Sequence, residues 1–135
     1  MAKKSLILLM LFINICCYSQ VNTTIKKLET EHQKCLDKGE SMLNCTLVFY
    51  NLMDDLLNVT YKEIRLKLNK TDQQKLKELQ LSWLKKRDAY FKQVEKKTTK
   101  LLEGDNSSQD FRMICTNSNA VFVKDRIIEL EKIYK

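Results

Sequence analysis

The chain has 135 residues, a formal net charge of +7, five cysteines, one histidine, two glycines and no proline. This length supports one domain with one hydrophobic core. With a single histidine, no Gly-rich phosphate loop and no nucleophile elbow, the sequence predicts no enzyme, no metal site and no cofactor. The absence of proline, together with many Lys, Leu and Glu residues, predicts long helices.

The N-terminus is typical of a secretory signal peptide. Lys3 and Lys4 precede an apolar stretch over 6–17, which is too short to span a bilayer. We expect cleavage after Ser19, which leaves a secreted or periplasmic domain over 20–135 without a transmembrane anchor. A lipoprotein attached through one of the two adjacent cysteines and an uncleaved anchor are the alternatives.

The periodicity of apolar residues predicts four helices and no strand, so the expected fold is an all-α antiparallel bundle. We expect the first helix over 24–37, stopped by Gly39, and the second over 41–68. The third is expected over 72–103, with Thr71 and Gln74 as a capping box.

The fourth helix is expected to begin at Ser107 or Ser108, after a polar loop, and to continue to near Tyr134. Four consecutive polar residues over 116–119 predict a kink or break within it, because such residues favour caps and turns.

Polar residues stand within the apolar stripes of the second and third helices. Folding the chain back around residue 70 places position x opposite roughly 140 − x. The fold-back then brings Asp54 close to Arg87 and Trp83 close to Asn58 or Tyr61, so we predict a buried Asp54–Arg87 ion pair. The residues of this structural motif are Asp54, Leu57, Asn58, Tyr61, Gln80, Trp83, Arg87 and Asp88.

These two runs resemble the core of the LprI-type lysozyme inhibitors, which are small helical domains of the cell envelope. The resemblance rests on Asp54-x-x-Leu57-Asn58-x-x-Tyr61 and Gln80-x-x-Trp83-x-x-x-Arg87-Asp88. A Met42-x-x-Cys45 turn, Cys115 and Arg126-x-x-x-Leu130 extend it over about 35–131. The family's Gly-Gly turn is shortened here to Gly104, and its cysteine after the Arg-Asp pair is replaced by Phe91.

Three cysteines remain after the predicted cleavage, and an exported chain oxidises cysteines where geometry permits. In the four-cysteine pattern of the family, Cys45 faces the position that Phe91 now holds. The resemblance therefore implies a Cys35–Cys115 disulfide, with Cys45 as a buried free thiol. A Cys35–Cys45 disulfide is the alternative.

Lysines gather on one face of the second half of the third helix, which indicates either a solvated face or a site for an anionic envelope polymer or lipid headgroup. Nucleic acid does not fit, because no aromatic residues alternate with these lysines. His32 lies in a polar run and is expected to be solvated. The lysines of this face are Lys85, Lys92, Lys96 and Lys100, with Lys86 and Lys97 beside them.

The resemblance implies a non-enzymatic binding protein that covers the cleft of a muramidase, with lysozyme or another envelope protein as its partner. Because common lysozymes are basic, the contact surface must be locally acidic. The acidic candidates are Glu29, Glu31, Asp37 and Glu40. The rival hypotheses are an envelope domain that binds an anionic ligand through the lysine face, and a secreted signalling protein of a eukaryote. The latter is suggested by five Asn-x-Ser/Thr sequons at Asn22, Asn44, Asn58, Asn69 and Asn106, of which Asn58 is expected to point inward.

Overall fold

The computed structural model describes residues 20–134 and consists, over that range, of four helices joined by short loops. The first helix covers 20–36, and α2 (Met42–Lys67), α3 (Lys70–Leu101) and α4 (Gln109–Ile133) follow. The prediction of an all-α bundle is confirmed. The predicted signal peptide over 1–19 lies outside the described residues.

The helix ends agree with local capping rules, with one correction. Gly39 follows the first helix at φ +68, the left-handed conformation predicted for a stop. Ser108 caps α4 by accepting from the backbone N–H of Phe111 at 3.1 Å. The predicted capping box at Thr71 is wrong, because Asn69 is the cap of α3 and accepts from the backbone N–H of Asp72 at 3.0 Å.

The predicted kink over 116–119 is also wrong, since α4 is one continuous helix. Cys115 and Ala120, which flank the polar residues, are both buried. Their packing against the core outweighs the weak local preference of Asn, Ser and Thr for turns.

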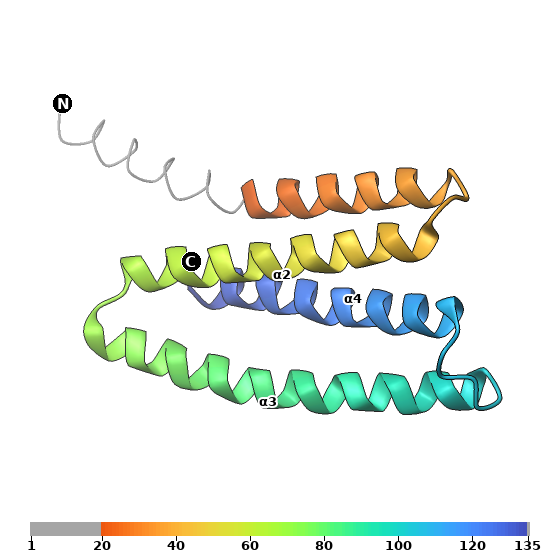
Figure 1. Cartoon of the computed structure of the whole chain (residues 1–135). Helices are drawn as coiled ribbons and strands as arrows, with labels where there is room; N and C mark the ends of the chain where they lie inside the picture. The colour runs from red at the N-terminus through yellow and green to blue at the C-terminus, as the bar shows by residue number, and fades with distance from the viewer. Residues whose placement is uncertain (1–19, 135) are drawn as a thin grey trace.

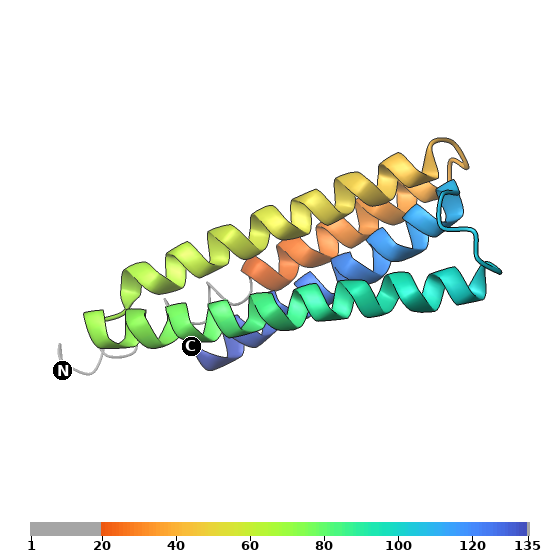
Figure 2. The ribbon, with the colours of Figure 1, turned by 60° about the horizontal axis from the view of Figure 1, so that its bottom comes forward.

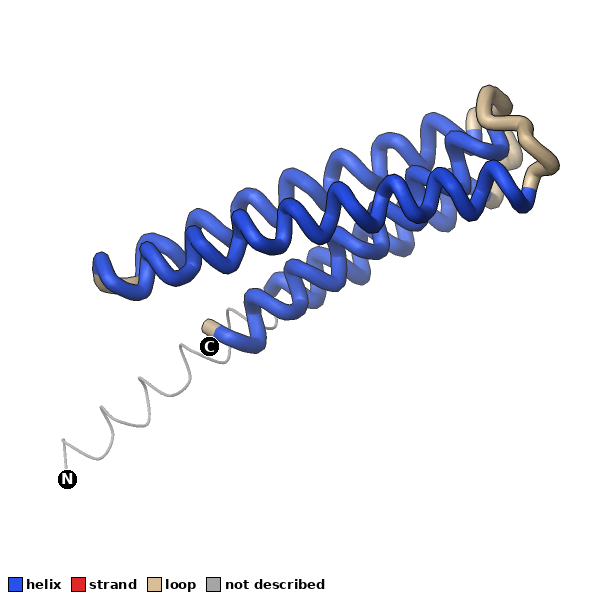
Figure 3. The backbone as a smooth tube through the Cα atoms, turned by 90° about the horizontal axis from the view of Figure 1, so that it is seen from below, coloured by secondary structure: helices blue, strands red, loops and turns tan. Residues whose placement is uncertain are grey.

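The four helices run side by side along the bundle (Figures 1 and 2). Because the chain reverses at each loop, α4 is parallel to α2 and antiparallel to α3. The last helix packs along α2 and also against α3, and in Figure 1 its ribbon runs between theirs. Figure 3 shows that the loops lie only at the two ends of the bundle.

The hairpin of α2 and α3 has the predicted register near its middle. Tyr50 and Phe91, whose numbers sum to 141, are edge-to-face neighbours with ring centroids 6.3 Å apart. The two apolar stripes do not face one another, however, because α4 packs against both helices while α2 and α3 have few direct contacts with each other.

The core consists of apolar side chains from all four helices. Met53, Leu76, Ala120, Val123, Ile127 and Leu130 are completely inaccessible. The rest of the buried cluster comprises Ile25, Phe49, Leu57, Ile64 and Trp83. Among helices within the described range, none is both long enough and apolar enough to cross a membrane.

Candidate functional site

The buried guanidinium group of this bundle belongs to Arg126 on α4, which is only 4% exposed. Its Nε and one terminal nitrogen donate to Oε1 of Gln80 on α3, at 3.1 and 3.0 Å. The other terminal nitrogen donates to Glu129 at 2.8 Å. The guanidinium carbon also lies 5.7 Å from the ring centroid of Trp83, within the range of a cation–π contact. Arg126 therefore connects α4 to two residues of the predicted motif.

Trp83 is the start of a row of aromatic rings between α3 and α4. It stacks on Phe122 with centroids 5.8 Å apart, and Phe122 stacks on Tyr90 at 4.3 Å. Such offset pairs stabilise beyond their buried area. This contact of Trp83 with Phe122 of α4 was not predicted, and the packing of Trp83 beside Asn58 or Tyr61 stays a prediction.

Arg87 also lies near Trp83, with its guanidinium carbon 5.9 Å from the ring centroid. Its ion pair joins Asp88, the next residue in the chain, at 2.8 Å, and its side chain is 27% exposed. The predicted Asp54–Arg87 ion pair is wrong: both residues are described, and no ion pair joins them.

Asp54 is half-buried, and its carboxylate accepts from the side chain of Asn58 at 3.3 Å. Asn58 is exposed rather than inward, so α2 turns this polar edge away from the core. Tyr50 lies close to the same groups. Burial raises the pKa of Tyr50, Asp54 and Asp88 raise it further, and Arg87 lowers it. Asp54, Arg87 and Asp88 thus lie around the half-buried hydroxyl group of Tyr50, and Asp54 and Arg87 do not form a buried ion pair.

An open depression of about 420 Å³ lies between α3 and α4, beside Trp83 and Arg126. Trp83 and Phe122 contribute its aromatic surface, while its edges carry charges of both signs. Its lining residues are Leu79, Ser82, Trp83, Lys86, Phe122, Asp125, Arg126 and Glu129. No group of three or more potential metal ligands occurs among the residues that the structure describes.

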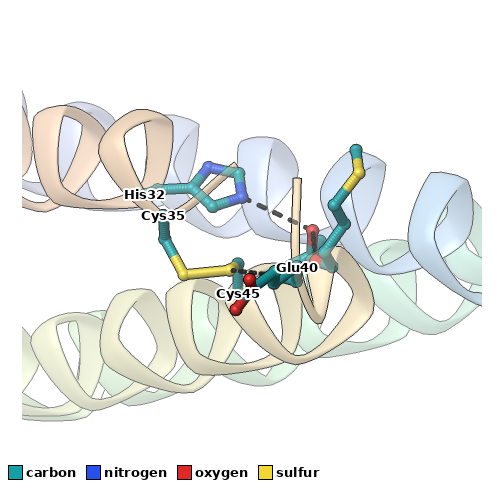
Figure 4. The surroundings of a disulfide bond; sticks show 6 residues. His32, Cys35, Glu40 and Cys45 are labelled. Carbon is teal, nitrogen blue, oxygen red and sulfur yellow. Dashed lines mark hydrogen bonds between the residues drawn. A yellow bond between two sulfur atoms is a disulfide. The ribbon is translucent and has the colours of Figure 1, made fainter. Parts of the chain in front are cut away.

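The disulfide joins Cys35 to Cys45, with the two Cα atoms 5.8 Å apart (Figure 4). The expectation of a Cys35–Cys115 bridge is therefore wrong, and Cys115 is the buried free thiol. The reversal at 37–41 brings the end of the first helix back beside the start of α2, which places Cys35 within bonding distance of Cys45. The alternative pairing weighed in the sequence is thus the observed one.

His32 is half-buried between the first helix and α2, so the expectation of a solvated histidine is wrong. Its ring stacks on Phe49 with centroids 4.4 Å apart, and Nε2 lies 3.4 Å from Oγ1 of Thr46 (Figure 4). Burial lowers the pKa of His32. The polar sequence around this residue gave no sign of the contact, because Phe49 lies in the following helix.

The four acidic candidates divide into one structural residue and three exposed ones. Glu29 accepts from Lys124 of α4 at 2.7 Å, which ties the first helix to the C-terminal helix. Asp37 and Glu40 are exposed in the turn that the disulfide holds, and Glu31 is exposed on the first helix, where it pairs with Lys27 at 3.9 Å. We call these three residues the acidic turn.

The four lysines of the predicted face, Lys85, Lys92, Lys96 and Lys100, are all exposed. Each of them is a described residue, and none forms an ion pair with another residue of that part of the chain. The structure therefore places them on a solvated surface and leaves their role untested.

Comparison with known proteins gives a family. A family model described as lysozyme inhibitor LprI matches residues 33–130. The chain belongs to the LprI lysozyme inhibitor family. No curated protein and no solved structure gives a match.

The LprI match covers both predicted runs, all three described cysteines and the late Arg126-Leu130 pattern. Several motif residues of this LprI domain have a direct part in its core. Leu57, Trp83, Arg126 and Leu130 are buried, and Gln80 is the hydrogen-bond partner of Arg126. A buried polar residue needs such a partner, so this part of the motif holds the helices together. The exposed surfaces are left as the places where a partner can bind.

Proposed function

We propose that this chain is an exported, non-enzymatic protein that binds a lysozyme and covers its cleft. The observation that carries the proposal is the match to the lysozyme inhibitor family over 33–130. The disulfide supports the proposed location, because such bonds persist in secreted and periplasmic proteins. The proposed mature domain begins at residue 20, after the predicted signal peptide.

The acidic turn is the proposed contact surface for the enzyme. The whole sequence carries a formal charge of +7, so a basic lysozyme is repelled unless the contact is locally negative. Asp37 and Glu40 supply exposed carboxylates on a turn that the Cys35–Cys45 bridge holds in place, and Glu31 adds a third from the preceding helix. A rigid turn loses little conformational entropy on binding.

The test is inhibition of a basic lysozyme by the mature chain, measured as the rate of cell-wall lysis. Neutralising the acidic turn by Glu31→Gln, Asp37→Asn and Glu40→Gln should weaken inhibition by about tenfold or more. The matched control neutralises three lysines, Lys92, Lys96 and Lys100, to Gln, and should leave inhibition equal or stronger because repulsion falls. Absence of inhibition by the unaltered chain would overturn the proposal.

The second proposed function is binding of an anionic envelope polymer or lipid headgroup through the lysine face. It is favoured by the four exposed lysines, none of which has an ion-pair partner within the described structure. Lys85, Lys92, Lys96 and Lys100 changed together to Gln should weaken retention on an anionic polymer and flatten its salt dependence. The acidic-turn variant should bind that polymer at least as well. Unchanged retention after the lysine substitutions would reject this function.

A further inference from the structure

An uncovered apolar stripe follows the outer face of α2. Leu52, Val59 and Leu66 are spaced seven residues apart. Each step of seven residues rotates the side chain by only about 20° around the helix axis, so the three lie on one face. Leu66 is 84% exposed, the largest value among the exposed large apolar side chains of the described residues. Val48 extends the stripe by one turn toward the disulfide. A run of this kind on a helix is unfavourable in water unless something covers it.

The stripe is bordered by two opposite charges on the same edge. Asp55 lies between Leu52 and Val59, and Lys62 lies between Val59 and Leu66. Both are exposed, and neither forms an ion pair with another residue in the described range. On this edge, the stripe is therefore acidic before Val59 and basic after it.

We propose that this stripe is the interface of a two-fold homodimer in which two α2 helices pack antiparallel. With the axis close to Val59, Leu52 faces Leu66 of the second copy, and Val59 faces its own counterpart. The same register places Asp55 opposite Lys62 of the second copy. A two-fold operation repeats every contact, so the dimer has two Leu–Leu contacts and two ion pairs.

The charge pattern selects this arrangement. In a parallel two-fold pairing, the edges that carry Asp55 and Lys62 lie on opposite sides of the interface in the two copies, so these residues do not meet. Antiparallel packing places the two edges side by side, so that each Asp55 meets a Lys62 of the second copy. A second copy of this chain is thus the partner whose chemistry fits the stripe.

Sedimentation equilibrium of the mature chain tests the proposal. We expect a concentration-dependent dimer, and Leu66→Lys should weaken it by about tenfold or more because a lysine replaces an apolar contact twice per dimer. The control Leu81→Lys changes an exposed leucine of α3 that lies outside the stripe, and it should leave the dimer unchanged. A monomer at every concentration, or a dimer insensitive to Leu66→Lys, would overturn the proposal.

Charge reversal tests the register. Asp55→Lys and Lys62→Asp should each weaken the dimer, because each creates two like-charge contacts, while the double exchange should restore it. Failure of the double exchange to restore association would reject this pairing.

A single cysteine tests the direction. Val59→Cys lies beside its own counterpart at the axis, so mild oxidation should give a covalent dimer. Val48→Cys should not, because antiparallel packing places its counterpart about 30 Å away at 1.5 Å per residue. Cross-linking through Val48→Cys would indicate a parallel dimer, in which Val48 and Val59 each lie beside their own counterparts, and would overturn the proposal.

Discussion

The two arginines beside Trp83 differ in where their partners come from. Arg126 bonds to Gln80, which is 46 residues away in the sequence and belongs to another helix. Arg87 bonds to Asp88, which adjoins it on the same helix. Their guanidinium carbons lie 5.7 and 5.9 Å from the Trp83 centroid, so the aromatic contact is nearly the same. We therefore expect Arg126 to stabilise the fold more than Arg87 does, because Arg126 is buried and its partner lies on another helix.

Replacement of each arginine by alanine measures this difference directly. Arg126→Ala should lower the free energy of unfolding by about 2–4 kcal/mol, because it leaves the Gln80 acceptor without its partner and opens a cavity beside Trp83. Arg87→Ala should cost less than about 1 kcal/mol, since its ion pair is exposed. Urea unfolding of the two variants gives both values. Equal losses of unfolding free energy in the two variants would show that the contact with the Trp83 ring determines the stabilisation, and not the hydrogen bond to another helix.

A pair of double-mutant cycles sharpens the same comparison. Removing Gln80 and Arg126 singly and together should give a coupling energy of about 1–2 kcal/mol, as expected for a buried hydrogen bond to a charged group. The matching cycle at Arg87 and Asp88 should give a coupling close to zero, within the range of exposed ion pairs. A coupling energy that is larger for Arg87 and Asp88 than for Gln80 and Arg126 would contradict this comparison.

The Lys124–Glu29 ion pair extends the comparison to the first helix. It spans 95 residues at 2.7 Å, whereas Lys27 and Glu31 form an exposed pair within one helix at 3.9 Å. We expect a coupling of about 0.5 kcal/mol for the first pair, decreasing at high salt, and almost none for the second. Thermal unfolding of the Gln variants at low and high salt measures both.

The smallest expected effect is the pH response of His32, the stacked histidine between the first two helices. Burial lowers its pKa in the folded chain, so the unfolded chain binds the proton more readily. This histidine should therefore reduce stability as the pH falls below about 6.5, the value for an unfolded histidine, and have no effect above it.

His32→Phe keeps an aromatic ring against Phe49 and removes the titration. The difference in Tm between this variant and the unaltered chain should grow in favour of the variant between pH 7 and pH 5. The difference in Tm excludes the contribution of the carboxylates, because they titrate in both proteins. Curves that remain parallel over this interval would show that folding does not change the pKa of His32.

The sequence predicts the helices well because each depends on neighbouring residues. The stop at Gly39, the cap at Ser108 and the Tyr50–Phe91 register all follow from local spacing and agree with the structure. The cap of α3 was misassigned because Asn69 and Thr71 are both good capping residues only two positions apart.

The partners across the helices could not be predicted in the same way. The hairpin argument considered α2 and α3 alone and paired Asp54 with Arg87, but α4 supplies the buried guanidinium through Arg126. The late Arg126-Leu130 pattern and Gln80 were the available signals, and only the position of α4 shows that they meet. The disulfide was misassigned for a related reason, since the family's four-cysteine pattern does not apply once Phe91 replaces one member.

The position of α4 also determines when this bundle can fold. Its links to Gln80 and Glu29 close loops of 46 and 95 residues, and its apolar residues complete the buried cluster shared by α2 and α3. A nascent chain that lacks α4 has the first helix and the hairpin of α2 and α3, but the apolar residues that pack against α4 remain in water. Contacts of such long sequence separation form slowly, because the entropy of closing the loop is lost before the contact stabilises the chain. Folding should therefore be nearly all-or-none and wait for the last helix, so that a ribosome-bound chain stopped before residue 109 remains sensitive to protease throughout.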